Sequence, residues 1–170
     1  MGEPLPAELE ALLERRRRWG ADTHDEVWAG VLHVTPAAHG RHGELQMAVM
    51  ELLGPPARAA GLTPTAEINL GEKDDFRVPD GALQRLRARL YYPSAALVLE
   101  VLSPGDESWE KLPFYAAHGV EELLIVDPHE RAVHWLALRE GQYLPIARSA
   151  LVNLGPEELA AQIDWPALDG

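Results

Sequence analysis

The chain has 170 residues, no cysteine and a formal net charge of -12; 46% of its residues are hydrophobic and 25% are charged. This length fits one soluble domain over residues 1–170, with residues 1–20 as a helical extension. Without cysteine, a disulfide framework and thiolate metal sites are excluded. The chain has no apolar run of eighteen residues and residues 1–20 lack a signal-peptide core, so we expect a cytoplasmic protein without a membrane span.

The negative charge argues against a generic nucleic-acid-binding protein. Such proteins gain affinity from many Lys and Arg contacts to phosphates and usually have a basic face. Here lysine occurs only at Lys73 and Lys111, and arginines cluster at residues 15–18 and 85–89. Tight binding of long DNA is therefore not expected from charge alone.

The N-terminal third predicts a helix, a hairpin and a second helix. Residues 6–18 have helical composition, and the arginines 15–18 favour a solvated end helix, with a phosphate-contacting arm as the alternative. Residues 24–35 predict a hairpin that turns at Ala29-Gly30. Residues 37–60 predict a helix, interrupted or ended near the Gly-Pro-Pro at residues 54–56. Its apolar stripe consists of Leu45, Val49, Leu52 and Leu53.

Three polar residues near the start of this second helix have a spacing that could hold a metal: His39, His42 and Glu44. A helix-start histidine is more often a surface or capping residue. Both interpretations stay open at this point, and Glu44 is an accessory site candidate.

Residues 62–83 predict two strands that lead to an aspartate. Residues 65–70 alternate between polar and apolar side chains, so Glu67 faces either a cleft or water. Pro79 forbids a ladder hydrogen bond and marks a strand start, an edge or a bulge. Asp80 then follows at a distorted point of the strand, where site residues often lie; a turn-capping aspartate is the ordinary alternative. Residues 84–92 read as a linker or a short helix.

Residues 95–102 predict a central strand that carries an anomalous acid. Glu100 lies between Leu99 and Val101, and burying its carboxylate costs several kcal/mol unless a cation or hydrogen bonds compensate. Lys111 follows in a helical segment. In a chain that otherwise uses arginine, it indicates chemistry that needs a compact ammonium, or else it is a solvated helix residue.

The remaining residues complete an alternating α/β pattern. Pro113 predicts that the helix after Lys111 either kinks there or begins near Leu112, and Tyr115 is expected to pack with its hydroxyl at the rim. Three strands and a helix follow, at residues 122–127, 133–138, 142–147 and 156–163. Asp127 is expected to cap a turn and Trp165 to anchor the last helix.

Taken together, Pro79-Asp80, Glu100 and Lys111 resemble the PD-(D/E)XK nuclease site. In the usual form the lysine lies two residues after the acid, where this chain has Leu102. The stretches LEVLSP, EKLPFYAAHGV and LLIVDP resemble the Uma family, a bacterial group of restriction endonucleases in which the lysine has moved to the helix. The resemblance covers about residues 24–150. It implies a restriction-endonuclease-like α/β fold, with a mixed central β-sheet flanked by helices.

The resemblance also implies a metal-dependent endonuclease. Asp80, Glu100 and the backbone carbonyl of Val101 would hold Mg²⁺ or Mn²⁺, and Lys111 would assist the attacking water or the transition state. Glu44, Glu67 and Ser103 are accessory candidates. The implied substrate is nucleic acid, with DNA expected, and the implied assembly is a homodimer.

Three other interpretations stay open. Asp80, Glu100 and Lys111 could form an internal ion-pair network that only stabilises the core. The chain could also be a non-catalytic interaction or regulatory module on the nuclease scaffold, which the acidic composition and the displaced lysine favour. A nuclease acting on small, structured or single-stranded substrates, or one recruited by a partner, is a third alternative.

Overall fold

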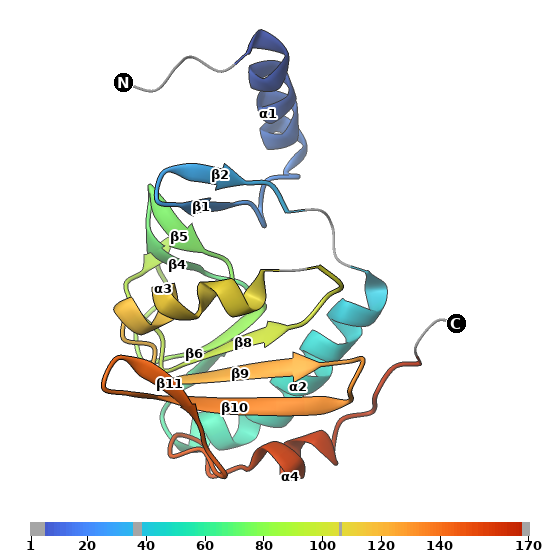
Figure 1. Ribbon diagram of the computed structural model, residues 1–170, viewed down its shortest axis with the longest axis vertical. Helices are drawn as coiled ribbons and strands as arrows, with labels where there is room; N and C mark the ends of the chain where they lie inside the picture. Colours follow the sequence, from blue (N-terminus) through green and yellow to red (C-terminus); the bar gives the residue numbers. More distant parts are fainter. Residues whose placement is uncertain (1–5, 36–38, 106, 168–170) are drawn as a thin grey trace.

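The computed structural model describes residues 6–35, 39–105 and 107–167, and it contains two β-sheets with helices around the larger one (Figure 1). The larger sheet has the strand order β11-β10-β9-β8-β6-β3. Only β8 and β9 pair in parallel, so the sheet is mixed, as expected. In spatial order its strands are Gln142–Pro145, Ala132–Arg139, Glu122–Asp127, Leu97–Val101, Gly81–Gln84 and Thr63–Thr65.

The centre of this sheet is the parallel pair β8 and β9. Parallel strands need a crossover connection, which here is the 3₁₀ helix η1 (Ser108–Lys111) followed by helix α3 (Leu112–Ala117). Pro113 lies in the first turn of α3, where its missing amide hydrogen removes no helical hydrogen bond. The prediction that the helix begins near Leu112 is therefore confirmed, and the alternative of a kink at Pro113 is wrong.

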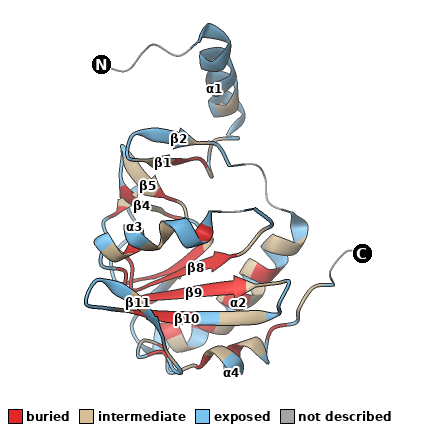
Figure 2. Cartoon of the chain, viewed as in Figure 1, coloured by how far each residue is buried: buried red, intermediate tan, exposed pale blue. Residues whose placement is uncertain are grey.

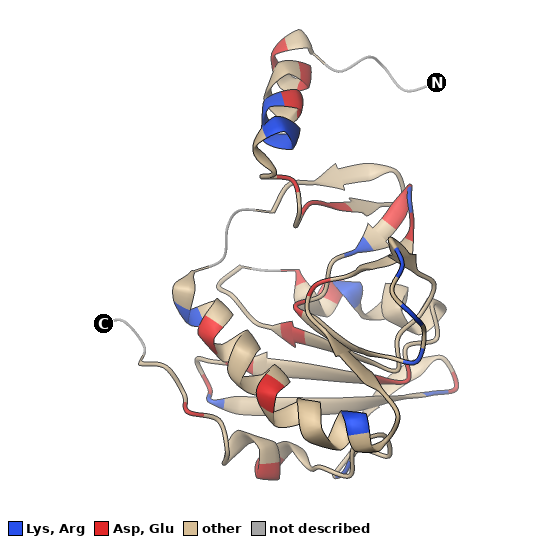
Figure 3. Cartoon of the chain, turned by 180° about the vertical axis from the view of Figure 1, so that it is seen from behind, with Lys and Arg blue, Asp and Glu red and all other residues tan. Residues whose placement is uncertain are grey.

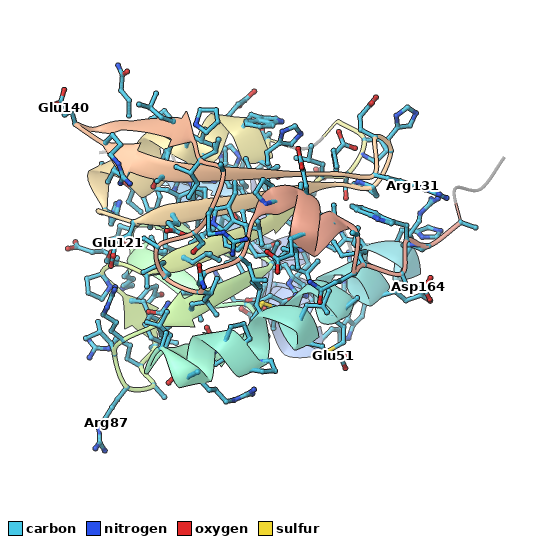
Figure 4. The ribbon with its side chains drawn as sticks, turned by 90° about the horizontal axis from the view of Figure 1, so that it is seen from below. Glu51, Arg87, Glu121, Arg131, Glu140 and Asp164 are labelled. Atoms are coloured by element: carbon cyan, nitrogen blue, oxygen red, sulfur yellow. The ribbon has the colours of Figure 1, made fainter. Side chains whose placement is uncertain are left out.

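The two faces of the larger sheet hold separate cores. Leu97, Leu99 and Val101 of β8 point toward helices α2 (Gly40–Ala59) and α4 (Pro156–Ala160); the view from below in Figure 4 shows α2 along one side of the larger sheet. Side chains alternate along a strand, so Val98 and Glu100 point to the opposite face, where Tyr115 of α3 packs. The alternation therefore places the side chain of Glu100 in the core that packs against α3.

Helix α2 contradicts one prediction, because it neither stops nor breaks at residues 54–56. It continues through Pro55 and Pro56 to Ala59. Leu53 and Ala57, on either side of the prolines, are both fully buried in the same core. Packing on this face outweighs the hydrogen bonds lost at the prolines, since most helical stability in proteins comes from tertiary contacts.

The smaller sheet has the order β2-β1-β5-β4-β7. The predicted hairpin is confirmed, with Ala29 and Gly30 both at positive φ in its turn. Residues 62–83 form four strands rather than two, because the chain passes from the smaller sheet to the larger one between β5 and β6. Pro79 therefore marks the approach to a strand start. In spatial order, the strands β2, β1, β5, β4 and β7 of the smaller sheet are Val31–His33, Glu26–Trp28, Asp75–Arg77, Asn69–Glu72 and Tyr91–Tyr92.

The predictions for the linker at residues 84–92, the turn at Asp127 and the C-terminal helix are largely confirmed. Residues 84–92 are linker-like apart from β7, and the oxygen of Asp127 accepts from the amides of residues 129 and 130 as a turn cap. Helix α4 ends earlier than predicted, and Trp165 anchors it by donating to the carbonyl of Ala160 at 3.0 Å. In the described part of the chain, no helix has the length and apolar character needed to cross a bilayer.

Helix α1 (Ala7–Trp19) agrees with the predicted end helix but is separate from both cores. None of its residues is buried, and it projects beyond the β1–β2 hairpin (Figures 1 and 2). Its last turn is tied to the body by Arg16, whose guanidinium lies 2.7 Å from a carboxylate oxygen of Asp25. The domain body therefore consists of the two sheets, α2, α3 and α4.

The packing of α2 predicts a clear difference between two truncations on the same helix. Leu53→Ala should lower the unfolding free energy by roughly 2–5 kcal/mol, because it leaves a cavity in a fully buried site. Met47→Ala, at a residue that is 61% exposed, should change it by less than about 0.5 kcal/mol. Chemical denaturation measures both values. Equal effects would show that α2 does not pack as described.

Candidate active site

A cleft of about 620 Å³ lies where the two sheets meet. It is lined by residues of β1 and β2, the start of α2, the connection into β6, the end of β8 and the segment leading into η1. Nearly all predicted site residues line it: Glu67, Asp80, Glu100, Val101, Ser103 and Lys111. Glu44 does not, because it lies on the exposed side of α2 while the adjacent Leu45 faces the core. The accessory role considered for Glu44 is therefore not supported.

Both carboxylate oxygens of Asp80 are held by neighbouring groups. Its Oδ2 accepts from the amide of Val101 at 2.7 Å, and its Oδ1 lies 2.8 Å from Nε2 of His42. The side chain of Gln46 also donates to the backbone carbonyl of Asp80. These contacts bring the Pro79-Asp80 pair against the end of β8, next to the residue that follows Glu100.

Glu100 is buried, with 4% of its surface exposed. Its Oε1 accepts a hydrogen bond from the hydroxyl of Tyr115 and lies 3.3 Å from Nζ of Lys111. Burial raises the pKa of Glu100 to about 7; Lys111 opposes this rise and the nearby Asp80 adds to it. This carboxyl is therefore harder to ionise than an exposed glutamate.

Tyr115 is not at the rim, as the sequence suggested, but fully buried beneath Glu100. Burial, together with the Glu100 carboxylate, raises the pKa of Tyr115 well above its usual value. Its hydroxyl stays protonated and acts as a fixed donor that orients Glu100.

Lys111 lies between two buried carboxylates. Its Nζ is 2.8 Å from Oε1 of Glu26 and 3.3 Å from Oε1 of Glu100, and its side chain is 12% exposed. Burial alone would lower the pKa of Lys111, but the two carboxylates outweigh burial and raise it. Lys111 is therefore a charged, enclosed ammonium, and its interpretation as a solvated helix residue is wrong.

Glu26 is a buried acid of the site that the sequence did not predict. Only 4% of its surface is exposed, and its carboxylate accepts three hydrogen bonds. Besides Lys111, it accepts from the amide of Val78 at 2.8 Å and from the indole of Trp28 at 2.7 Å. From sequence alone, an acid in a short strand is expected to face solvent. Its partner Lys111 is 85 residues away, so no local pattern links the two residues. Only the three-dimensional fold reveals this pairing.

Arg77 fastens the β1–β2 hairpin over the site. Its guanidinium carbon lies 4.3 Å from the ring centre of Trp28 and 4.0 Å from that of Phe114, and the group donates to the carbonyl of Val27 at 2.9 Å. Cation–π contacts of this kind are worth roughly 2 kcal/mol when desolvated. Because Arg77 bridges β1 and α3, it fixes the distance between the elements that carry Glu26 and Lys111.

The histidines near the start of α2 do not form the metal cluster that their spacing suggested. Nδ1 of His39 accepts from the amide of Arg41 and caps the helix, whereas His42 lies between Asp80 and the hydroxyl of Ser103, with Nδ1 3.1 Å from that hydroxyl. Across the described residues, no group of three or more His, Cys, Asp or Glu side chains could hold a metal by itself. Of the other candidates, Glu67 faces the cleft rather than only water, with His24 3.4 Å away.

The donor chemistry of the cleft nevertheless fits a hard divalent cation. Asp80 and Glu100 supply carboxylate oxygens, which Mg²⁺ and Mn²⁺ prefer over nitrogen or sulfur. Mg²⁺ usually keeps several waters and binds proteins through one or two carboxylates together with substrate phosphates. Two protein carboxylates in a polar cleft are therefore compatible with such a site.

Comparison with known proteins points in the same direction. The family model Uma2, described as "Putative restriction endonuclease", matches residues 7–166, a longer segment than the predicted resemblance and one that includes α1. A solved structure described as a putative nuclease of DUF820, from Anabaena variabilis, superimposes with a TM-score of 0.63. It is 15% identical, and the match covers 81% of this chain and 90% of that one, so the likeness supports the fold. No curated protein matches the chain.

The raised pKa of Glu100 predicts a pH-dependent stability. A carboxyl whose pKa is higher in the folded state favours folding most below its ordinary value of 4.5, and this contribution is lost as the pH rises through about 7. The loss should amount to about 3 kcal/mol. Denaturant unfolding in a chelating buffer, from about pH 5 to about pH 8, should show it. Glu100→Gln should flatten the profile, whereas Glu67→Gln at the cleft rim should preserve it. An unchanged profile in Glu100→Gln would contradict the assignment.

Proposed function

Because the chain belongs to the Uma2 family of restriction-endonuclease-like proteins, we propose that it is a metal-dependent endonuclease that hydrolyses phosphodiester bonds of DNA. One observation carries this proposal. Asp80, Glu100 and the enclosed ammonium of Lys111 face the same cleft, although 31 residues separate the first from the last. Two carboxylates and a lysine that converge in this way match the site pattern of metal-dependent phosphodiester hydrolysis.

Asp80, Glu100 and the backbone carbonyl of Val101 would hold Mg²⁺ or Mn²⁺. When bound there, the metal supplies a lowered pKa for an attacking water and positive charge beside the scissile phosphate. The amide of Val101 and the ring of His42 keep the Asp80 carboxylate in place, and Tyr115 does the same for Glu100. These positioning contacts reduce the reorganisation that metal binding requires.

Lys111 would act as a fixed positive charge. The carboxylates around it keep it protonated, so it cannot accept a proton from water at neutral pH. Its ammonium can instead orient the attacking water and stabilise the negative charge that builds up on the phosphate in the transition state. This assigns Lys111 an electrostatic role, and the reaction needs no covalent intermediate.

The net charge of -12 indicates how the substrate would bind. Among the described residues, the carboxylates of Glu26, Glu67, Asp80, Glu100 and Glu107 line the cleft with the single ammonium of Lys111. Phosphate would be repelled from such a surface unless divalent cations offset its charge. We therefore propose that DNA binding depends on the metal. We also propose a homodimer located in the cytoplasm.

A second candidate function is a non-catalytic interaction module. One observation favours it: Lys111 is already paired with both Glu26 and Glu100, which is the arrangement of a stabilising ion-pair network. Removing one member of such a network costs about 3–5 kcal/mol. The two functions differ in metal binding, which only the first requires.

Calorimetric titration of Mn²⁺ and Mg²⁺ tests the proposed metal site. Binding should be lost in Asp80→Asn and Glu100→Gln, while Lys111→Ala should retain it and lose cleavage of plasmid DNA. Circular dichroism on each variant controls for folding. A folded wild type that binds no metal, with or without a short DNA duplex present, would favour the non-catalytic module.

The contact between Glu26 and Lys111 predicts a separable effect on catalysis. Glu26→Gln keeps the size of the side chain but removes the charge that holds the ammonium, so kcat should fall on the order of 10²-fold. Metal affinity should fall by a smaller factor than kcat, since Glu26 is not proposed as a ligand. Glu51→Gln, at an exposed position of α2 outside the cleft, serves as the matched control. If Glu26→Gln lowered metal affinity and left kcat unchanged, the assigned positioning role would be wrong.

A further inference from the structure

Helix α1 and strand β2 carry an unusual share of exposed apolar surface. In the described residues, eleven large apolar side chains are exposed, and six of them lie between residues 9 and 34. Six exposed apolar side chains within one short segment are more than the single, scattered ones that most protein surfaces carry. The six are Leu9, Leu12 and Trp19 of α1, and Val31, Leu32 and the adjacent Val34 of the β2 segment.

Helix α1 has few contacts that would stabilise it in the single chain. It has 13 residues, and isolated helices of this length are marginal in water. Its C-terminal end is fixed by Arg16, which contacts Asp25 and the carbonyl of Ala21, while none of its residues is buried (Figure 2). A projecting helix with exposed leucines therefore gains stability when another surface packs on it.

The charges of α1 identify that surface. Glu8 and Glu10 lie in its first turn, and three arginines, Arg16, Arg17 and Arg18, lie in its last turn (Figure 3). Two copies of this helix packed antiparallel place each acidic end beside a basic end, whereas parallel packing would place like charges together. We propose that α1 and β2 form the interface with a second copy of this chain, with the two α1 helices antiparallel.

The geometry of the projecting helix supports this arrangement. Thirteen residues span about 20 Å, so two antiparallel helices can overlap along their full length between the two bodies. The N-terminal end of each helix then reaches the partner's hairpin, where β2 is an edge strand with exposed Val31 and Leu32. A two-fold axis makes this interface self-complementary and closed.

The interface would also lie next to the proposed active sites. His33 of β2 and the adjacent Val34 line the cleft that holds Asp80 and Glu100. The inference deepens the proposed homodimer and rests on that proposal, but it does not depend on nuclease activity. It implies that the two clefts of a dimer open near one shared surface.

Sedimentation equilibrium of the full chain tests the interface. The double variant Leu9→Ala/Leu12→Ala should raise the dimer dissociation constant at least tenfold, since both side chains are exposed in the single chain but buried in the dimer, and alanine removes the apolar contact without adding a charge. Leu144→Ala, at an equally apolar residue that is 50% exposed on the far strand β11, should leave the constant unchanged. Circular dichroism and thermal unfolding confirm that each body remains folded.

A charge exchange tests the antiparallel orientation. Glu8→Arg/Glu10→Arg alone should be monomeric, because two basic ends then meet, and Arg15→Glu/Arg17→Glu alone should be monomeric for the converse reason. In a parallel pair, by contrast, Glu8→Arg/Glu10→Arg would only replace one like-charge contact with another and would leave dimerisation unchanged. An equimolar mixture of the two variants should form a heterodimer, which shows that each variant is folded and that charge repulsion alone kept it monomeric. Arg16 is left intact in both, since it holds the helix to Asp25.

The outcomes separate the proposals. A wild type that is monomeric at tens of micromolar would overturn both the homodimer and this interface. A dimer that survives Leu9→Ala/Leu12→Ala would overturn the interface and leave the homodimer standing. Loss of metal binding or cleavage in Asp80→Asn bears on the nuclease proposal alone, because Asp80 lies outside α1 and β2.

Discussion

The interaction on which the rest of the site depends is the buried chain of charges Glu26–Lys111–Glu100. Each carboxylate is almost inaccessible to water, and a buried charge is tolerated only when an opposite charge and hydrogen bonds offset its lost hydration. Lys111 supplies that charge to both acids at once, and Tyr115, Trp28 and the amide of Val78 supply the hydrogen bonds. The three charged residues come from β1, β8 and η1. Their pairing therefore joins the smaller sheet to the larger one at the cleft.

The backbone supports this arrangement in two ways. Pro79, which cannot donate a ladder hydrogen bond, lies where the chain leaves the smaller sheet. The side chain of the following residue, Asp80, is held by the amide of Val101 and by His42. On the other side of the hairpin, Arg77 lies between the rings of Trp28 and Phe114. The first contact fixes Asp80 relative to β8, and the second fixes β1 relative to α3.

Much of this architecture could be predicted from the sequence, for identifiable reasons. The strands β8 and β9 are short apolar runs bounded by turn residues, and the acid inside β8 is anomalous enough to mark the site. Lys111 stood out because lysine is rare in this chain. The sequence could not reveal Glu26 or the burial of Tyr115, because both depend on partners far along the chain. It also misled at residues 54–56, where local proline chemistry predicts a break that the packing of Leu53 and Ala57 prevents.

The topology of the site has a consequence for biosynthesis. Strand β8 carries Glu100 and Val101 into the cleft, and it is hydrogen-bonded on one side to β6 and on the other to β9, which ends at Asp127. A chain emerging from the ribosome therefore cannot bring Glu26, Asp80, Glu100 and Lys111 together until most of its length has been made, because contacts between distant residues form late. A fragment that stops before β9 would lack the strand that holds β8 in the sheet, so the cleft would be completed only in a nearly full-length chain.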